Sequence, residues 1–209
     1  MLRAHPLLKH PVAWHLFNFL FIAGYQHFLL FLIATPAYVA YTRKGEPLNW
    51  GDAIAIVWCI VSLALETTAD QQQWSFQEAK HGRRPKQAEA EGDYKRGFLT
   101  RGLFRFSRHP NFFGEQCVWW AFFVFSAAAL GPERGDSWVN WTLIGCVLLS
   151  LLFQGSTPFT EGITLKKYPL YAEYQRVTSA LLPLPRFGTP SWEAGGEALL
   201  DEVDNNSKY

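Results

Sequence analysis

A short basic motif holds the densest set of residues able to bind a charged ligand. It reads Gly102-Leu-Phe-Arg-Phe-Ser-Arg-His-Pro-Asn-Phe-Phe-Gly-Glu115. Arg105 and Arg108 carry planar, permanently charged donors that suit phosphate, and His109 can donate or accept a hydrogen bond. Pro110 favours an extended residue before it and the first turn of a helix after it. Because a helix start also attracts anions, the motif predicts an anion-binding site.

Three later residues of the motif favour a ligand site over a simple membrane anchor. Asn111 can hydrogen-bond an amide or a hydroxyl, and Gly114 permits the close approach of another backbone. Glu115 is a favourable charge in a first helical turn and a further candidate ligand contact. Basic side chains that only reach for the membrane interface would explain the arginines, but not an Asn and a Glu around a Gly.

Two acidic residues in an apolar stretch form a second candidate group. Glu66 and Asp70 are four residues apart, so they share one face of a helix and repel each other mildly. This repulsion favours a donor-rich partner, either a Lys or Arg of the following loop or the hydroxyls and amides of a ligand. The alternative is a solvated helix end without a ligand.

Polar residues also interrupt the first apolar stretch. At 100° per residue, His15, Asn18 and Gln26 fall within about 80° of arc, whereas His27 lies outside it. Such residues either hydrogen-bond between helices or line a ligand cavity, and both interpretations stay open. Asn18, Gln26 and His27 are therefore the candidate substrate-binding residues.

The distribution of charge identifies the environment of these groups. The chain has 209 residues, of which 16% are aromatic and only 18% charged, against about 25% charged in a typical soluble domain. The mean hydropathy is near zero, yet four uncharged runs of 33, 13, 17 and 24 residues lie between charged ones. This pattern excludes a disordered chain, a secreted disulfide scaffold and a nucleic-acid binder with a broad basic face.

The uncharged runs predict an all-α fold, a polytopic integral membrane helix bundle with about four transmembrane helices. A bilayer core of about 30 Å needs about 20 apolar residues in a helix. The expected spans are residues 12–41, 50–70, 112–130 and 138–160. The single cysteines, Cys59, Cys117 and Cys146, fall within spans and lack metal-ligand spacing, so buried thiols and no metal site are expected.

Basic residues predict the orientation of the bundle. The N-terminus, the loop over 77–110 and the segment after the last span together hold 16 Lys or Arg, against 3 in the other two connections. By the positive-inside rule, these three segments are cytosolic. One membrane domain is expected over 1–187, followed by a flexible polar tail over 188–209.

The chain resembles the steroid 5-alpha-reductase C-terminal-domain superfamily, nearest to its uncharacterised fungal and bacterial reductase-like membrane proteins. The resemblance covers roughly residues 10–187. The residues that carry it are the segment Leu103–Glu115, Glu161, Lys167-Tyr168-Pro169-x-Tyr171-x-x-Tyr174, Leu182-Pro183 and, upstream, Glu66-x-x-x-Asp70-x-Gln72.

The resemblance implies a membrane reductase of the endoplasmic reticulum that binds NADPH on the cytosolic side. The hydride would pass to a conjugated or activated carbon–carbon double bond of a steroid or other lipid. The positions that match those near the cofactor in this superfamily are Asp70, Asn111, Glu115, Glu161 and Tyr168. Glu66 joins them as an acid for ribose or amide donors, while Arg105, Arg108 and His109 are candidates for the phosphates from their chemistry.

One departure concerns the substrate. Steroid reductases of this superfamily have further helices before the matching region, and these carry the Tyr and carboxylate that polarise the substrate carbonyl. Three explanations stay open: a shortened homologue, a fragmentary gene model, or a divergent protein that has lost the reaction. In a shortened homologue, Tyr25, Gln26 and His27 would be the local substitutes. The catalytic residues, the proton donor, the lipid and the oligomeric state are not predicted.

Two other functions remain open at this point. Isoprenylcysteine carboxyl methyltransferases, which use S-adenosylmethionine, share a similar Arg-His-Pro motif, although they usually have paired Glu residues where Gly162 follows Glu161 here. A non-catalytic membrane scaffold or lipid-binding protein would predict that Glu66, Asp70 and Glu115 do not converge.

Overall fold

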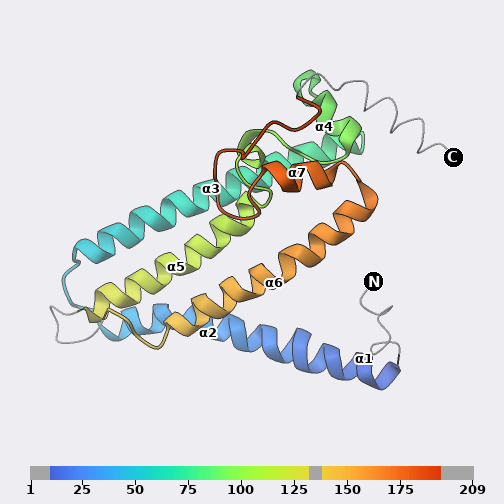
Figure 1. Cartoon of the computed structure of the whole chain (residues 1–209). Helices are drawn as coiled ribbons and strands as arrows, with labels where there is room; N and C mark the ends of the chain where they lie inside the picture. Colours follow the sequence, from blue (N-terminus) through green and yellow to red (C-terminus); the bar gives the residue numbers. More distant parts are fainter. Residues whose placement is uncertain (1–9, 132–137, 194–209) are drawn as a thin grey trace. The chain divides into compact units, whose positions relative to one another are not determined.

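The protein is all-helical over the residues that its computed structural model describes, 10–131 and 138–193. Four of its helical segments are long and apolar enough to cross a membrane (Figure 1): Pro11–Thr42, Trp50–Lys80, Pro110–Leu130 and Leu143–Lys167. The predicted fold class, an all-α membrane protein with four spans, is confirmed.

The first span is one continuous helix with a π-helical middle. It comprises α1 (Pro11–Phe17), the π-helix η3 (Asn18–Tyr25) and α2 (Gln26–Thr42). A π-helix has more residues per turn than an α-helix, because its hydrogen bonds join residues five apart. The angular argument that placed Asn18 and Gln26 on one face therefore does not hold across this segment.

Helix α3 (Trp50–Lys80) begins at a reciprocal cap and extends past its expected end at residue 70. The side-chain oxygen of Asn49 accepts from Gly51 N at 2.8 Å, and Asp52 Oδ2 accepts from Asn49 N at 2.9 Å. After Gly51 in the first turn, no Gly or Pro occurs until Gly82, which has φ +75° and follows the end of the helix. The extension carries Gln73, Gln77 and Lys80 beyond the apolar segment.

Helix α5 (Pro110–Leu130) starts at the proline of the motif, two residues before the expected span, so Glu115 lies beyond its first turn and the predicted first-turn position is wrong. Helix α6 (Leu143–Lys167) starts later than residue 138 and ends later than residue 160. Asn140 caps the start, because its Oδ1 accepts from Thr142 N at 3.0 Å. The helix continues through Pro158, and the hydroxyl of Thr160 bonds the carbonyls of Ser156 and Thr157 at 3.1 and 2.9 Å.

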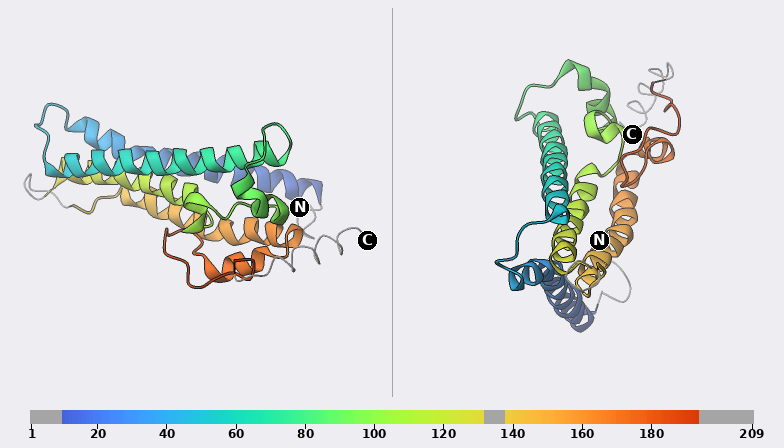
Figure 2. Two further views of the ribbon diagram at one scale, coloured as in Figure 1. Left: turned by 90° about the horizontal axis from the view of Figure 1, so that it is seen from above. Right: turned by 90° about the vertical axis from the view of Figure 1, so that its left-hand side faces the viewer.

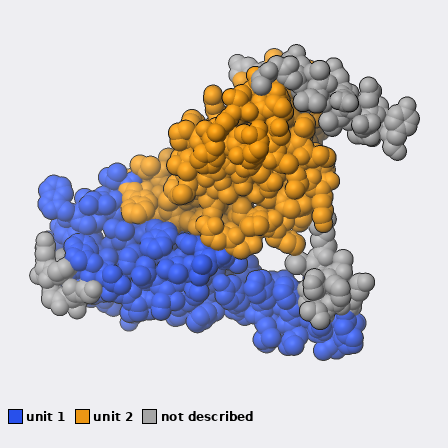
Figure 3. Space-filling view, in the orientation of Figure 1, with its two compact units in different colours: residues 1–57, 119–152 blue, residues 58–118, 153–209 orange. Residues whose placement is uncertain are grey.

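The chain divides into two compact units (Figure 3): residues 1–57 with 119–152, and residues 58–118 with 153–209. In unit 1, small residues allow close helix packing. A Cβ on Gly145 would lie 2.7 Å from the Leu32 backbone, and one on Gly51 would lie 2.7 Å from Ala128 Cβ. The expected membrane domain over 1–187 stays a prediction.

Unit 2 contains the shorter elements: η4 (Ala88–Ala90), α4 (Glu91–Arg96), η5 (Gly102–Arg105) and α7 (Tyr171–Val177). Figures 1 and 2 show α4 and α7 in the same region as the end of α3. The core of this region is an aromatic cluster of Phe98, Tyr171 and Tyr174. The buried Tyr174 hydroxyl donates to Phe104 O, which ties α7 to the basic motif.

Of the expected tail, residues 188–193 lie within the described part and 194–209 lie outside it. Trp192 packs edge-on against Phe98, with ring centroids 6.2 Å apart, and Ser191 N donates to Glu173 Oε2 at 2.7 Å. Residues 191 and 192 are therefore held by unit 2. The hydrogen bond from Ser191 also lowers the pKa of Glu173.

Candidate functional site

Some of the predicted cofactor residues line a pocket of about 500 Å³ within unit 2, called the Asn111 pocket. The end of α3, the basic motif, the start of α5, the end of α6 and α7 all contribute to it. Its lining residues are Gln73, Gln77, Lys80, His81, Gly97, Phe98, Leu99, Phe104, Arg108, His109, Asn111, Phe112, Thr164, Lys167, Tyr168, Tyr171 and Tyr174. Four predicted residues, Arg108, His109, Asn111 and Tyr168, thus share one pocket.

Three of the predicted acids, on α3 and α5, lie near one another, and one of them bonds the pocket residue Asn111. Asn111 Nδ2 donates to Asp70 Oδ1 at 2.9 Å, which joins α5 to α3. Gly114 lies directly against Glu66, because a Cβ at Gly114 would come within 2.9 Å of the Glu66 Cβ. Glu66 in turn interacts electrostatically with both Glu115 and Asp70. The three acids therefore converge, which is the opposite of what the scaffold alternative predicts.

Glu161 is the centre of a buried hydrogen-bond network. Its two oxygens accept from Arg108 Nε at 2.6 Å and Arg108 Nη2 at 3.0 Å. His109 Nε2 lies 2.9 Å from Oε1, and because a carboxylate only accepts, this nitrogen carries the proton. Gln175 and Tyr171 also donate to Glu161, at 2.9 and 3.3 Å. Burial raises the pKa of Tyr171, so its hydroxyl stays a donor.

The remaining donors of Arg108 serve the fold. Its Nη1 donates to the carbonyls of Gln175, at 3.0 Å, and Thr178. With only 10% of the side chain exposed, Arg108 joins α6, α7 and the motif. The predicted phosphate contact of Arg108 stays a prediction, and the structure adds a positioning role that the sequence did not suggest.

Sequence reasoning missed the partner of Tyr168. Lys80 Nζ donates to the Tyr168 hydroxyl at 2.7 Å and to Gly97 O at 2.6 Å. Lys167 also lies over the Tyr168 ring, 5.2 Å from its centroid. Burial opposes ionisation of this phenol, but hydrogen bonds and charge from Lys80 and Lys167 outweigh it and lower the pKa of Tyr168. The sequence does place Lys80 on the same helix face as Gln73 and Gln77, at spacings of seven and three residues.

Removing the ammonium group of Lys80 should raise the pKa of Tyr168. We expect Lys80→Met to move the phenol titration to higher pH, measured as the ultraviolet difference between each protein and its Tyr168→Phe counterpart. The pKa of Tyr168 is lower in the folded protein than in the unfolded chain, where it is about 10. Ionised Tyr168 therefore stabilises the fold fully above about pH 10, and this stabilisation is lost as the pH falls through the folded pKa. Lys95→Met, which removes an exposed partner of Glu91, is the matched control and should leave the titration unchanged.

Gly97 supports Tyr168 from the other side. Its φ is +87°, and a Cβ there would lie 2.3 Å from Tyr168 Cε1. Gly82 has a similar φ of +75°, but a Cβ at Gly82 would meet nothing within 4 Å. Gly82→Ala should lower the free energy of unfolding by about 1–2 kcal/mol through backbone strain. Gly97→Ala should have the same strain and lose about 1–3 kcal/mol more through overpacking against Tyr168. Thermal unfolding of both variants checks this, and equal losses would contradict the packing of Tyr168 on Gly97.

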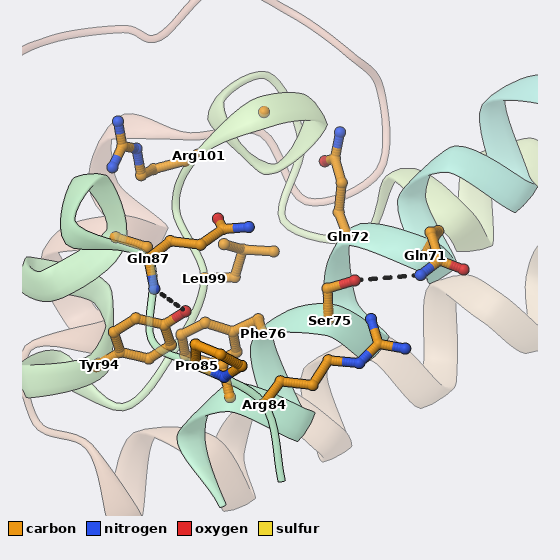
Figure 4. A pocket seen from close by; sticks show the side chains of 13 residues that line it. Gln71, Gln72, Ser75, Phe76, Arg84, Pro85, Gln87, Tyr94, Leu99 and Arg101 are labelled. Atoms are coloured by element: carbon orange, nitrogen blue, oxygen red, sulfur yellow. Dashed lines mark hydrogen bonds between the residues drawn. The ribbon is translucent and has the colours of Figure 1, made fainter. Parts of the chain in front are cut away.

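A second pocket of about 480 Å³ lies along the same part of unit 2 (Figure 4) and is called the Arg101 pocket. It is bounded by two arginines, three glutamines and an aromatic pair in which Phe76 stacks on Tyr94 at 5.3 Å. Gln72 Oε1 accepts from Leu103 N at 2.9 Å, where Gly102 adopts φ +59°. Figure 4 shows Arg84 and Arg101 at different sides of this pocket. Leu99 lines both pockets.

Several predicted residues do not line the Asn111 pocket. Arg105 is exposed on η5. Asn18, Gln26 and His27 belong to unit 1, where Gln26 and His27 are exposed and His27 Nδ1 bonds Ala23 O at 2.6 Å. Their roles in binding phosphate or substrate stay predictions. Over the described residues, no group of three His, Cys, Asp or Glu could hold a metal ion.

Comparison with known proteins places the chain in a family. The model of DUF1295, a protein family of unknown function, matches residues 3–178. An uncharacterised protein of Schizosaccharomyces pombe is 38% identical over 175 residues, which is 80% of this chain and 49% of that protein. The chain therefore spans about half the length of this curated relative. No solved structure matches this chain. Because the family model covers most of its residues, the chain belongs to the DUF1295 family.

Proposed function

We propose that the protein is a membrane-bound reductase that uses NADPH to reduce a carbon–carbon double bond in a steroid or other lipid. The observation that carries the proposal is the convergence of Asn111 with Asp70, and of Tyr168 with Lys80, on one pocket. The pocket lies where helices of membrane-spanning length end, so an apolar substrate and a polar cofactor could both reach this region of unit 2. Endoplasmic reticulum localisation and a cytosolic orientation of the basic loop belong to the same proposal.

The size and the chemical groups of the Asn111 pocket support the proposal of a nucleotide cofactor. Its volume of about 500 Å³ falls within the usual range for small-molecule sites, about 300–1,000 Å³. Asp70 and Asn111 provide a carboxylate and an amide for ribose hydroxyls or a carboxamide. The Phe112 ring, stacked with His109 at 5.0 Å, provides an aromatic surface.

Cationic groups around the two pockets suit phosphate. Lys80 and Lys167 line the Asn111 pocket, and Arg84 and Arg101 line the neighbouring one. Guanidinium groups can bind phosphate with two parallel hydrogen bonds. Because Arg108 is engaged by Glu161, we assign phosphate binding first to these four residues, one of which, Lys80, also holds Tyr168.

The protein's own contribution is placement. NADPH, when bound, supplies the hydride. Glu161 fixes the orientation of His109 and Arg108, and Gly97 and Lys80 fix the Tyr168 ring. Ordered side chains of this kind reduce the reorganisation that binding would otherwise require.

Thermal unfolding of purified protein in detergent with NADPH, NADH or S-adenosylmethionine tests the proposal. A ligand at 100 times its Kd adds about 2.7 kcal/mol of apparent stability, which is readily detected. Selective stabilisation by NADPH is the expected result. Stabilisation by S-adenosylmethionine alone would instead support a methyltransferase, and no response to any of them would support a non-catalytic protein.

A further inference from the structure

In the segment from Leu181 to Phe187, several apolar side chains are exposed and the charged side chain is buried, which is the reverse of a typical water-exposed loop. Leu182, Leu184 and Phe187 are 55%, 39% and 69% exposed. The charged residue among them points inward, since the Arg186 side chain is 8% exposed, donates to Thr100 O at 2.8 Å and pairs with Glu193. Exposed apolar side chains beside a buried guanidinium are unfavourable when the segment is surrounded by water. The same arrangement is favourable when the segment is surrounded by lipid.

Hydrogen bonds fasten this segment to the entrance of α5. Leu184 N donates to Phe106 O at 3.0 Å, and Ser107 Oγ donates to Leu181 O at 2.8 Å. His109 N donates to Ala180 O at 3.0 Å immediately before the helix starts. Phe106 is itself 45% exposed. The two hydrogen-bonded segments therefore carry four exposed apolar residues. We call these residues the apolar patch: Phe106, Leu182, Leu184 and Phe187.

The length of α5 locates the patch relative to a bilayer. Its 21 residues extend about 31 Å as an α-helix. This length matches a hydrocarbon core of about 30 Å, so its first residue, Pro110, lies at a membrane boundary. Asn111 bonds Asp70, and Trp74, one turn further along α3, is 57% exposed. An exposed Trp at this level is typical of the interfacial aromatic belt.

We propose that the apolar patch inserts into the boundary between lipid headgroups and acyl chains, beside the start of α5. The partner is the lipid surface itself, and the patch continues the membrane contact of α5 rather than forming a separate surface. Arg105, exposed and next to Phe106, is placed to meet lipid phosphate. This inference does not depend on the proposed reductase function.

Fluorine NMR of the full chain in phospholipid vesicles tests the proposal. Trifluoromethyl-phenylalanine replaces Phe106 in one protein and Phe187 in a second, and both changes are conservative. In a third protein, the control, the same amino acid replaces Lys95. Lys95 is on α4 of the same unit, and its side chain is 55% exposed. Relaxation by dissolved oxygen reports apolar surroundings, whereas relaxation by a water-soluble nickel chelate reports aqueous ones.

At Phe106 and Phe187, the ratio of oxygen to nickel relaxation should be several-fold higher than at Lys95. A ratio equal to that at Lys95 would place the patch in water and overturn the proposal. Protection from both reagents would also overturn it, because a second copy of the chain or another protein would then cover the patch. Thermal unfolding of each labelled protein verifies that the fold is retained.

Discussion

Replacing Glu161 with alanine should lower the free energy of unfolding by about 3–5 kcal/mol, the usual cost of removing one partner of a buried ion pair. The Glu161 and Arg108 side chains are 6% and 10% exposed. Without the carboxylate, the guanidinium keeps its charge in a largely dry environment and loses two hydrogen bonds. His109, Tyr171 and Gln175 lose an acceptor at the same time.

Chemical or thermal unfolding in detergent measures this loss. The matched control is Glu91→Ala, since Glu91 is 71% exposed and pairs with Lys95 at 3.5 Å. An exposed pair contributes about 0–1 kcal/mol. The double variant Arg108→Met, Glu161→Leu should be more stable than either single variant, because it leaves no charge unpaired. Equal losses for Glu161→Ala and Glu91→Ala would contradict the buried network.

Replacing Asn111 with alanine should weaken NADPH binding about 5- to 150-fold, which corresponds to about 1–3 kcal/mol. The variant removes an amide that lines the Asn111 pocket and leaves Asp70 without this donor. A carboxylate that loses its partner either repels an anionic ligand or has to be repositioned when the ligand binds. Titration of purified protein with NADPH, followed by nucleotide fluorescence, gives the two dissociation constants.

Asn49→Ala provides the control for this variant. Asn49 Nδ2 donates to Ala128 O at 2.9 Å, and its side-chain oxygen caps α3, all within unit 1. This substitution should reduce stability by about 0.5–2 kcal/mol through loss of the cap and leave the NADPH affinity unchanged. If both variants weakened binding equally, a general loss of stability would explain the result and Asn111 would have no specific role in the site.

The chain's own sequence determined the four spans and the start of α5. Hydrocarbon offers no partner for backbone N–H and C=O groups, so a long uncharged segment has to be helical whatever it packs against. Pro110 marked the start of α5 for an equally local reason, its fixed φ and missing N–H. Asp70 and Asn111 were both predicted near the cofactor, although their mutual hydrogen bond was not.

The tertiary structure decided the partners of the charged groups. Lys80 and Tyr168 are 88 residues apart, and Arg108 and Glu161 are 53 apart, so no periodicity joins them. The motif suggested that Arg108 faces a phosphate, but its donors are turned onto Glu161 and two carbonyls of the C-terminal segment. Arg186 likewise points inward where its apolar neighbours point outward. Spacing along a chain determines which face of an element a residue occupies, whereas the pairing of buried charges depends on which distant segments pack together and exclude water.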